Sequence, residues 1–270
     1  MPAAILVKDL KLPMEGAALQ ARWLLHHGHH DFHREPTLVF LHEGLGSIAQ
    51  WRDFPEALAR RTKLPALIYD RLGHGGSPAL TQPRTMAYLE VEAYQTLPQV
   101  LAATGIAAPV LVGHSDGGTI ALLYAARFPE KVTAVLSEAA HVFLEPVTIQ
   151  GLCAARTAYM GGTLRTKLER MHGDKVDSLF RGWNDTWLNP AARDWDITAS
   201  LTTLQCPLLL IQGEEDAYGS PAQIQAVVSR VQGPVESLLI PHCGHSPHLQ
   251  AQELVLAHMD AFLRKFSVSA

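Results

Sequence analysis

Short apolar runs recur along most of this chain, and longer segments with helical spacing of apolar residues lie between them. The apolar runs cover residues 37–41, 66–69, 110–112, 132–136, 207–212 and 235–240. Runs of this length, rich in Val, Leu and Ile, are typical of strands that are fully buried in a sheet. The predicted helices cover residues 51–60, 86–104 (with a kink at Pro98), 120–128, 222–231 and 249–266. This alternation predicts an α/β fold with a mostly parallel sheet and helices on both faces.

Two segments depart from this alternation. Residues 5–12 and 18–25 are apolar runs separated by a turn-forming stretch, which predicts a hairpin and brings the sheet to roughly eight strands. Between residues 140 and 201 no further strand of this kind occurs, and glycines and a proline divide the segment into several short helices.

Composition excludes several classes of protein. The chain has 270 residues, 47% of them hydrophobic, which is enough for one large core, and its formal net charge is −4. A weakly acidic chain gives no electrostatic reason to expect nucleic acid or an anionic membrane as a partner. No apolar stretch is long enough to cross a bilayer, and no signal peptide is evident. Cys153, Cys206 and Cys243 form no C-x-x-C pattern, so we expect reduced thiols in a cytoplasmic protein.

The run at 110–112 passes through Gly113, Ser115 and Gly117 directly into a helical segment. A strand that turns sharply into a helix forces its corner residue into a strained conformation, and small neighbours allow the backbones to approach. The corner residue is Ser115, so its hydroxyl should project beside the free N–H groups of the new helix. Those donors suit a negative charge that develops on a substrate carbonyl oxygen.

This G-x-S-x-G sequence between a strand and a helix resembles the nucleophile elbow of the α/β-hydrolases. The family orders its catalytic residues as nucleophile, acid and histidine. Asp216 lies four residues after the run at 207–212, in a G-x-x-D sequence, and His245 lies in G-H-S before the last helix. The resemblance therefore implies a triad in which Asp216 orients His245 and His245 activates Ser115. It requires no metal ion and no organic cofactor.

A second loop carries the same resemblance. Residues 42–47, His-Glu-Gly-Leu-Gly-Ser, are similar to the H-G-x-x-G loop of the family, except that Glu43 stands in place of the first glycine. The resemblance implies that the backbone N–H of Gly44 is one donor of an oxyanion hole and that the N–H of Asp116 is the other.

Alternatives remain for two of the roles. Glu138, Glu214 and Glu215 are other candidates for the acid, and His242 and His248 flank His245. We expect these neighbours to be solvated loop carboxylates and surface histidines.

The resemblance also implies a division of the chain. Residues 140–201 would form a helical cap over a core made of residues 1–139 and 202–270. Trp183 and Trp187 lie in this segment and are candidates for the substrate pocket, although they could equally pack the cap onto the core.

Asp116 distinguishes this chain from many family members, which have an apolar residue or glutamine after the serine. Residues 115–118, Ser-Asp-Gly-Gly, resemble the Ser-Asp-Gly-Gly sequence at the nucleophile of valacyclovir hydrolase-like esterases. In those enzymes the aspartate binds the α-amino group of the substrate. Asp116 would then favour aminoacyl esters. Alternatively, its carboxylate is stabilised by the first turn of the helix and contacts no substrate.

The function that these features favour is hydrolysis of a small-to-medium carboxylic ester through an acyl-enzyme, with a small-molecule acyl compound as the partner. Thioesters, lactones, aminoacyl esters and the C–C bonds of ring-cleavage products use the same three residues and remain alternatives. A catalytically silent receptor of the same fold is the non-enzyme alternative. The oligomeric state cannot be predicted, because sequence does not locate an exposed apolar patch.

Overall fold

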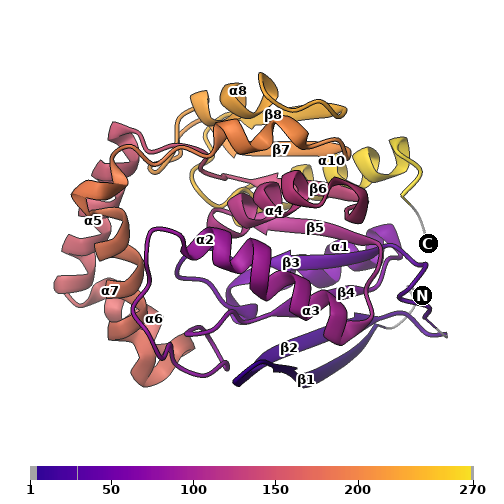
Figure 1. The fold of residues 1–270 in the computed structure, drawn as a ribbon, viewed down its shortest axis with the longest axis horizontal. Coiled ribbons are helices and arrows are strands. Elements are labelled where there is room, and N and C mark those ends of the chain that lie inside the picture. The colour runs from indigo at the N-terminus through magenta and orange to yellow at the C-terminus, as the bar shows by residue number, and fades with distance from the viewer. Residues whose placement is uncertain (1–4, 29, 269–270) are drawn as a thin grey trace.

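In the computed structural model, which describes residues 5–28 and 30–268, one sheet of eight strands runs through the molecule (Figure 1). The strands are β1 (Leu6–Met14), β2 (Ala17–Leu25), β3 (Thr37–Leu41), β4 (Ala66–Tyr69), β5 (Pro109–His114), β6 (Ala134–Glu138), β7 (Leu208–Gly213) and β8 (Val235–Ile240). Their order is β1-β2-β4-β3-β5-β6-β7-β8. β1 and β2 form an antiparallel hairpin, β2 pairs antiparallel with β4, and all other pairs are parallel. The predicted fold class is confirmed.

The described part of the chain forms helices that cover both faces of this sheet and others that lie beyond one of its ends. They are η1 (Ile48–Trp51), α1 (Phe54–Thr62), α2 (Tyr88–Val91), η2 (Glu92–Thr96), α3 (Leu97–Thr104), α4 (Asp116–Arg127), η3 (Pro129–Lys131), α5 (Pro146–Met160), α6 (Thr163–His172), η4 (Gly173–Lys175), α7 (Val176–Trp187), η5 (Pro190–Ala192), η6 (Thr198–Thr203), α8 (Ala222–Val228), α9 (Pro247–Gln250) and α10 (Gln252–Lys265). None of the described helices is long and apolar enough to span a bilayer.

The alternation of side chains along each strand divides the core into two layers. In β3, Leu38 and Phe40 pack with residues of α1 and α10 on one face. Val39 and Leu41 pack with residues of α3 and α4 on the other. All four side chains are at most 1% exposed, which is why residues 38–41 are all apolar instead of alternating with polar residues.

Some predicted boundaries differ from the structure. The helix expected at residues 86–104 is divided by the π-helical turn η2, which ends directly before Leu97. Because Pro98 has no N–H to donate, the regular hydrogen-bond pattern cannot continue through it, and the irregular turn lies on its N-terminal side. The helix expected at 249–266 is divided into α9 and α10 at Ala251, whose φ of −134° is not helical.

Three helices of the segment between β6 and β7, α5, α6 and α7, lie together at the left of Figure 1, beyond one end of the sheet. Both ends of the described chain lie on the opposite side. Trp183 of α7 contacts Gly44 in the loop after β3, so this helix covers the carboxyl ends of the central strands. The division into a cap at 140–201 and a core at 1–139 and 202–270 stays a prediction, and residues 1–4 and 269–270 lie outside the described residues.

Candidate active site

The turn from β5 into α4 holds Ser115 in a conformation that non-glycine residues rarely adopt, with φ of 54° and ψ of −117°. The residues two positions away on either side, Gly113 and Gly117, are small because nothing larger fits. A Cβ atom on Gly113 would overlap the carbonyl oxygen of Gly117, and one on Gly117 would overlap that of Leu41. The strained corner is therefore held by close backbone packing on both sides.

The structure brings together the three residues of the predicted triad from three separate loops. The Oγ atom of Ser115 lies 3.0 Å from Nε2 of His245. On the other side of the ring, Nδ1 of His245 lies 2.8 and 2.9 Å from the two carboxylate oxygens of Asp216. Such a chain of contacts allows one nitrogen to accept the hydroxyl proton while the other is held by the carboxylate.

The carboxylate of Asp216 is suited to hold an imidazolium. Burial alone would raise the pKa of Asp216, but the hydrogen bond and charge of His245 outweigh this effect and bring the pKa below its usual range. The backbone N–H of Tyr218 also donates to Asp216 Oδ1 over 2.8 Å. Asp216 is therefore ionised at neutral pH and oriented by its own loop.

The alternative acids and bases lie elsewhere. Glu214 is exposed. Glu215 pairs with His242 over 3.1 Å at the surface, where their side chains are 64% and 92% exposed. The expectation of a solvated neighbour is wrong for Glu138 and His248, which are buried and pair with each other over 2.9 Å. The backbone N–H and Nδ1 of His248 both contact Oε2 of Glu138, at 3.1 and 2.9 Å, whereas Oε1 of Glu138 has no hydrogen-bond partner among the described residues.

One predicted oxyanion donor, Asp116, lies in the elbow itself, and the other, Gly44, lies in the loop after β3. Asp116 is the first residue of α4, where backbone N–H groups have no intrahelical acceptor. In the other loop, Arg71 donates from Nη2 to the carbonyl oxygen of Glu43 over 2.7 Å. Because the C=O and N–H of one trans peptide point in opposite directions, the N–H of Gly44 points away from Arg71. Neither donor has a hydrogen-bond acceptor among the described residues.

The side chain of Asp116 is engaged by the protein itself. Its Oδ2 accepts a hydrogen bond of 2.7 Å from the hydroxyl of Tyr88, which in turn accepts one of 2.8 Å from Nε1 of Trp187. The guanidinium of Arg71, which is fully buried, lies 3.6 Å from the same oxygen. Tyr88 and Arg71 could not be predicted as partners of Asp116. Arg71 lies in the loop after β4 and Tyr88 begins α2, and no sequence pattern links either residue to Asp116.

A small cavity of about 30 Å³ lies against Ser115. Its lining includes Ser115, Asp116, His245, Leu152, Trp183, Trp187, Trp195 and Tyr218. This volume holds only one or two water molecules, so a substrate must displace some of these side chains to reach the serine. Both predicted tryptophans, Trp183 and Trp187, line the cavity, and both also belong to the hydrophobic core.

Comparison with known proteins identifies the family and agrees with the fold. A model of the alpha/beta hydrolase fold family matches residues 36–203. A 2-succinyl-6-hydroxy-2,4-cyclohexadiene-1-carboxylate synthase from Enterobacter sp. (strain 638) is 24% identical over 85% of this chain and 92% of its own length. The structure of 2-hydroxy-6-oxo-6-phenylhexa-2,4-dienoate hydrolase from Rhodococcus sp. strain RHA1 aligns with a TM-score of 0.78 and 17% identity, covering 97% of this chain and all of that one. A proline iminopeptidase from Mycobacterium smegmatis aligns with a TM-score of 0.73 and 20% identity, covering 96% and 98%.

Proposed function

This chain belongs to the alpha/beta hydrolase family, and from that premise we propose that it cleaves a small-to-medium carboxylic ester with Ser115 as nucleophile. The observation that carries the proposal is the continuous set of contacts from Asp216 through His245 to Ser115, at 2.8 and 3.0 Å. Its ends come from loops about a hundred residues apart in sequence, so local sequence preferences alone do not bring them together.

In the proposed mechanism, His245 takes the proton of the Ser115 hydroxyl as the oxygen attacks the substrate carbonyl carbon. Asp216 holds the ring in the required tautomer and stabilises the imidazolium that forms. The same histidine then gives its proton to the leaving alcohol. A water molecule, deprotonated by His245, hydrolyses the acyl-enzyme and restores the serine.

The negative charge on the former carbonyl oxygen is stabilised by the backbone N–H groups of Gly44 and Asp116. Both groups are held in place before the reaction, Asp116 by the helix start and Gly44 by the bond that Arg71 makes to the carbonyl oxygen of the Glu43–Gly44 peptide. Removing one such donor from a hydrolase typically costs about 2.7–4 kcal/mol of barrier.

The three catalytic residues alone do not determine which class of substrate is cleaved. Thioesters, lactones, aminoacyl esters and C–C bonds next to a carbonyl would be attacked by the same three residues. The small cavity and its aromatic lining, which includes Trp183 and Trp187, support an acyl group of modest size. The side chain of Asp116 gives less support to aminoacyl esters, since its Oδ2 already binds Tyr88 and lies beside Arg71.

A fluorophosphonate probe and p-nitrophenyl acetate test the proposal together. We expect covalent labelling at Ser115 and ester turnover, both abolished in Ser115→Ala. A panel of acyl chain lengths, thioesters, lactones, dienone and aminoacyl substrates then identifies the preferred class. Labelling without turnover of any panel member would favour the silent receptor instead.

A further inference from the structure

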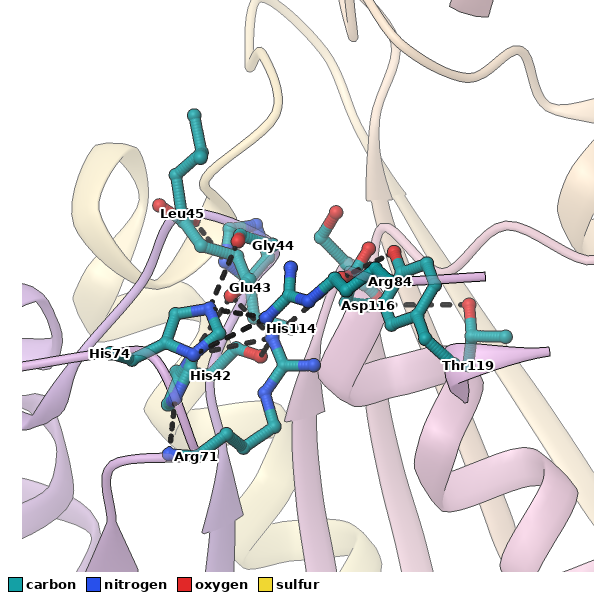
Figure 2. Close-up of polar contacts among 12 residues, drawn as sticks. His42, Glu43, Gly44, Leu45, Arg71, His74, Arg84, His114, Asp116 and Thr119 are labelled. Carbon is teal, nitrogen blue, oxygen red and sulfur yellow. Dashed lines mark hydrogen bonds and ion pairs between the residues drawn. The ribbon is translucent and has the colours of Figure 1, made fainter. Parts of the chain in front are cut away.

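Both ring nitrogens of His114, the residue before Ser115, face hydrogen-bond acceptors. Nδ1 lies 2.8 Å from a carboxylate oxygen of Glu43, and Nε2 lies 2.6 Å from the main-chain carbonyl oxygen of His245. Figure 2 shows Glu43 and His114 side by side, with Gly44 next to Glu43. The imidazole thus connects the loop after β3 with the loop after β8.

These contacts restrict where the protons are. A carbonyl oxygen only accepts, so Nε2 must carry a proton. An ionised carboxylate also only accepts, so with Glu43 ionised Nδ1 must carry one as well. A neutral imidazole has a single N–H, and only the imidazolium can donate to both partners.

The surroundings of His114 favour the charged ring although it is only 2% exposed. Burial would lower its pKa, but the charge and hydrogen bond of Glu43 outweigh burial and raise the pKa to about 9. Burial likewise would raise the pKa of Glu43, but His114 brings it down to about 2. The other titratable groups that face the ring are Glu138, which favours the cation, and His245 and His248, whose rings lie 5.1 and 4.8 Å away.

The ion pair between Glu43 and His114 lies next to all three parts of the proposed active site. Glu43 directly precedes Gly44, His114 directly precedes Ser115, and the carbonyl that accepts from His114 belongs to His245. Glu43 also stands where the H-G-x-x-G pattern has glycine, so the loop gains an anchor that glycine cannot provide. Hydrogen bonds between charged partners are roughly twice as strong as neutral ones.

We propose that His114, held as an imidazolium between Glu43 and the main-chain carbonyl of His245, positions the oxyanion loop and the general base relative to the nucleophile. Glu43 and His114 are thus positioning residues, which touch no substrate. The inference rests on the proposed function for its effect on catalysis, whereas the protonation state of His114 does not depend on it.

The first experiment measures that state without a substrate. The ¹⁵N resonances of the histidine rings are recorded at pH 7.5 and assigned to His114 by their absence in His114→Gln. We expect two protonated ring nitrogens in the unmodified protein and only one in Glu43→Gln. Two protonated nitrogens support the ion pair even if no ester is hydrolysed, and a single one overturns the inference.

The second experiment measures ester hydrolysis. Displacing a catalytic group by about 1 Å can cost about 10²-fold in rate, so we expect kcat of Glu43→Ala to fall by about that factor with KM within about threefold. Glu43→Gln can still bond a neutral His114 and should lose less, about tenfold. The matched control is Glu35→Gln, because Glu35 pairs with a largely buried His30 over 2.9 Å, before the start of β3 and far from the elbow. Its kcat should equal that of the unmodified protein.

Unchanged kcat in a folded Glu43→Ala would overturn the positioning role. If that variant does not fold, Glu43→Gln decides in its place, since it preserves size and shape. Failure of the proposed function gives a different result from failure of the positioning role. In that case Ser115→Ala has the same activity as the unmodified protein.

Discussion

The indole of Trp183, in α7, lies directly against the α-carbon of Gly44, in the loop that follows β3. A Cβ atom on residue 44 would overlap Nε1 of Trp183 and lie 2.5 Å from its Cδ1. The same atom would lie 3.1 Å from Oδ2 of Asp116. Gly44 is therefore required for the close approach of three segments at the proposed oxyanion hole.

Gly44→Ala should impair ester hydrolysis and lower the free energy of unfolding by about 1–3 kcal/mol, because the added methyl group overpacks a site lined by a buried indole. The methyl group forces either Trp183 or the loop to move, and a displacement of about 1 Å corresponds to about 10²-fold in kcat. Steady-state kinetics with p-nitrophenyl acetate measure this loss. The double variant Gly44→Ala/Trp183→Ala removes the overlap with the indole and should recover part of it.

Gly182→Ala is the control for this substitution. Gly182 precedes Trp183 in the same helix, and a Cβ atom there meets only Arg84 side-chain atoms, at 3.8 Å or more. Alanine in a helix interior is about 0.5–1 kcal/mol more favourable than glycine. Stability should rise slightly and kcat should not change. Equal kinetics for Gly44→Ala and Gly182→Ala would contradict the requirement for glycine at residue 44.

Asp216→Asn should leave the fold intact and reduce kcat by about 10⁴-fold, as expected when the carboxylate that orients a catalytic histidine is lost. When the amide N–H of the new side chain donates to Nδ1 of His245, the ring carries its proton on Nε2. In this tautomer Nε2 can no longer accept the proton of Ser115. Glu214→Gln, in the same loop but exposed, tests the rival acid and should retain full activity. Loss of activity in Glu214→Gln but not in Asp216→Asn would reverse the assignment.

Much of this architecture could be predicted because its signals are local. Each parallel strand is a short apolar run, and Ser115, Asp216 and His245 each follow such a run in a loop with a recognisable sequence. The carboxyl ends of parallel strands meet at one edge of the sheet, so the topology alone brings the three loops near one another. The catalytic roles of these residues stay predictions.

The partners of the buried polar groups could not be predicted in the same way. His114 bonds the carbonyl of a residue 131 positions away, and Glu138 pairs with His248 across 110 positions. Which acidic group meets which histidine depends on side-chain packing between elements, and no spacing rule encodes it. For that reason the prediction of a surface position is wrong for Glu138 and His248. Glu215 and His242, which also lie near strand ends, are exposed.

Asp116→Asn tests whether the carboxylate serves the protein or the substrate. We expect a loss of about 3 kcal/mol in the free energy of unfolding, because the buried guanidinium of Arg71 loses the charge 3.6 Å away. We expect an unchanged ratio of kcat/KM between an aminoacyl ester and a neutral ester of the same size. Denaturant unfolding and the two kinetic measurements check these outcomes.

Tyr88→Phe is the companion of that variant, since it removes a hydroxyl and keeps the charge of Asp116. It leaves Nε1 of Trp187 without its acceptor, which costs about 1–3 kcal/mol. The kinetic ratio should again stay constant. A selective loss of aminoacyl ester hydrolysis in Asp116→Asn alone would show that the carboxylate binds an α-amino group.

His172 makes the stability of the chain depend on pH. It is 1% exposed in α6, where Nδ1 accepts from the N–H of Gly75 and Nε2 donates to the carbonyl of Leu45, both over 3.0 Å. Burial lowers the pKa of His172 from 6.5 to about 4, so the unfolded chain takes up a proton at a higher pH than the folded one. The stabilisation is complete well above pH 6.5 and is lost as the pH falls towards 4, by about 2.5 kcal/mol at pH 4.5. Denaturant unfolding between pH 7.5 and 4.5 should therefore show a smaller decrease in the free energy of unfolding for His172→Gln than for the unmodified protein. The control His242→Gln, at an exposed site, should follow the unmodified protein. Parallel curves for all three proteins would contradict the role of His172.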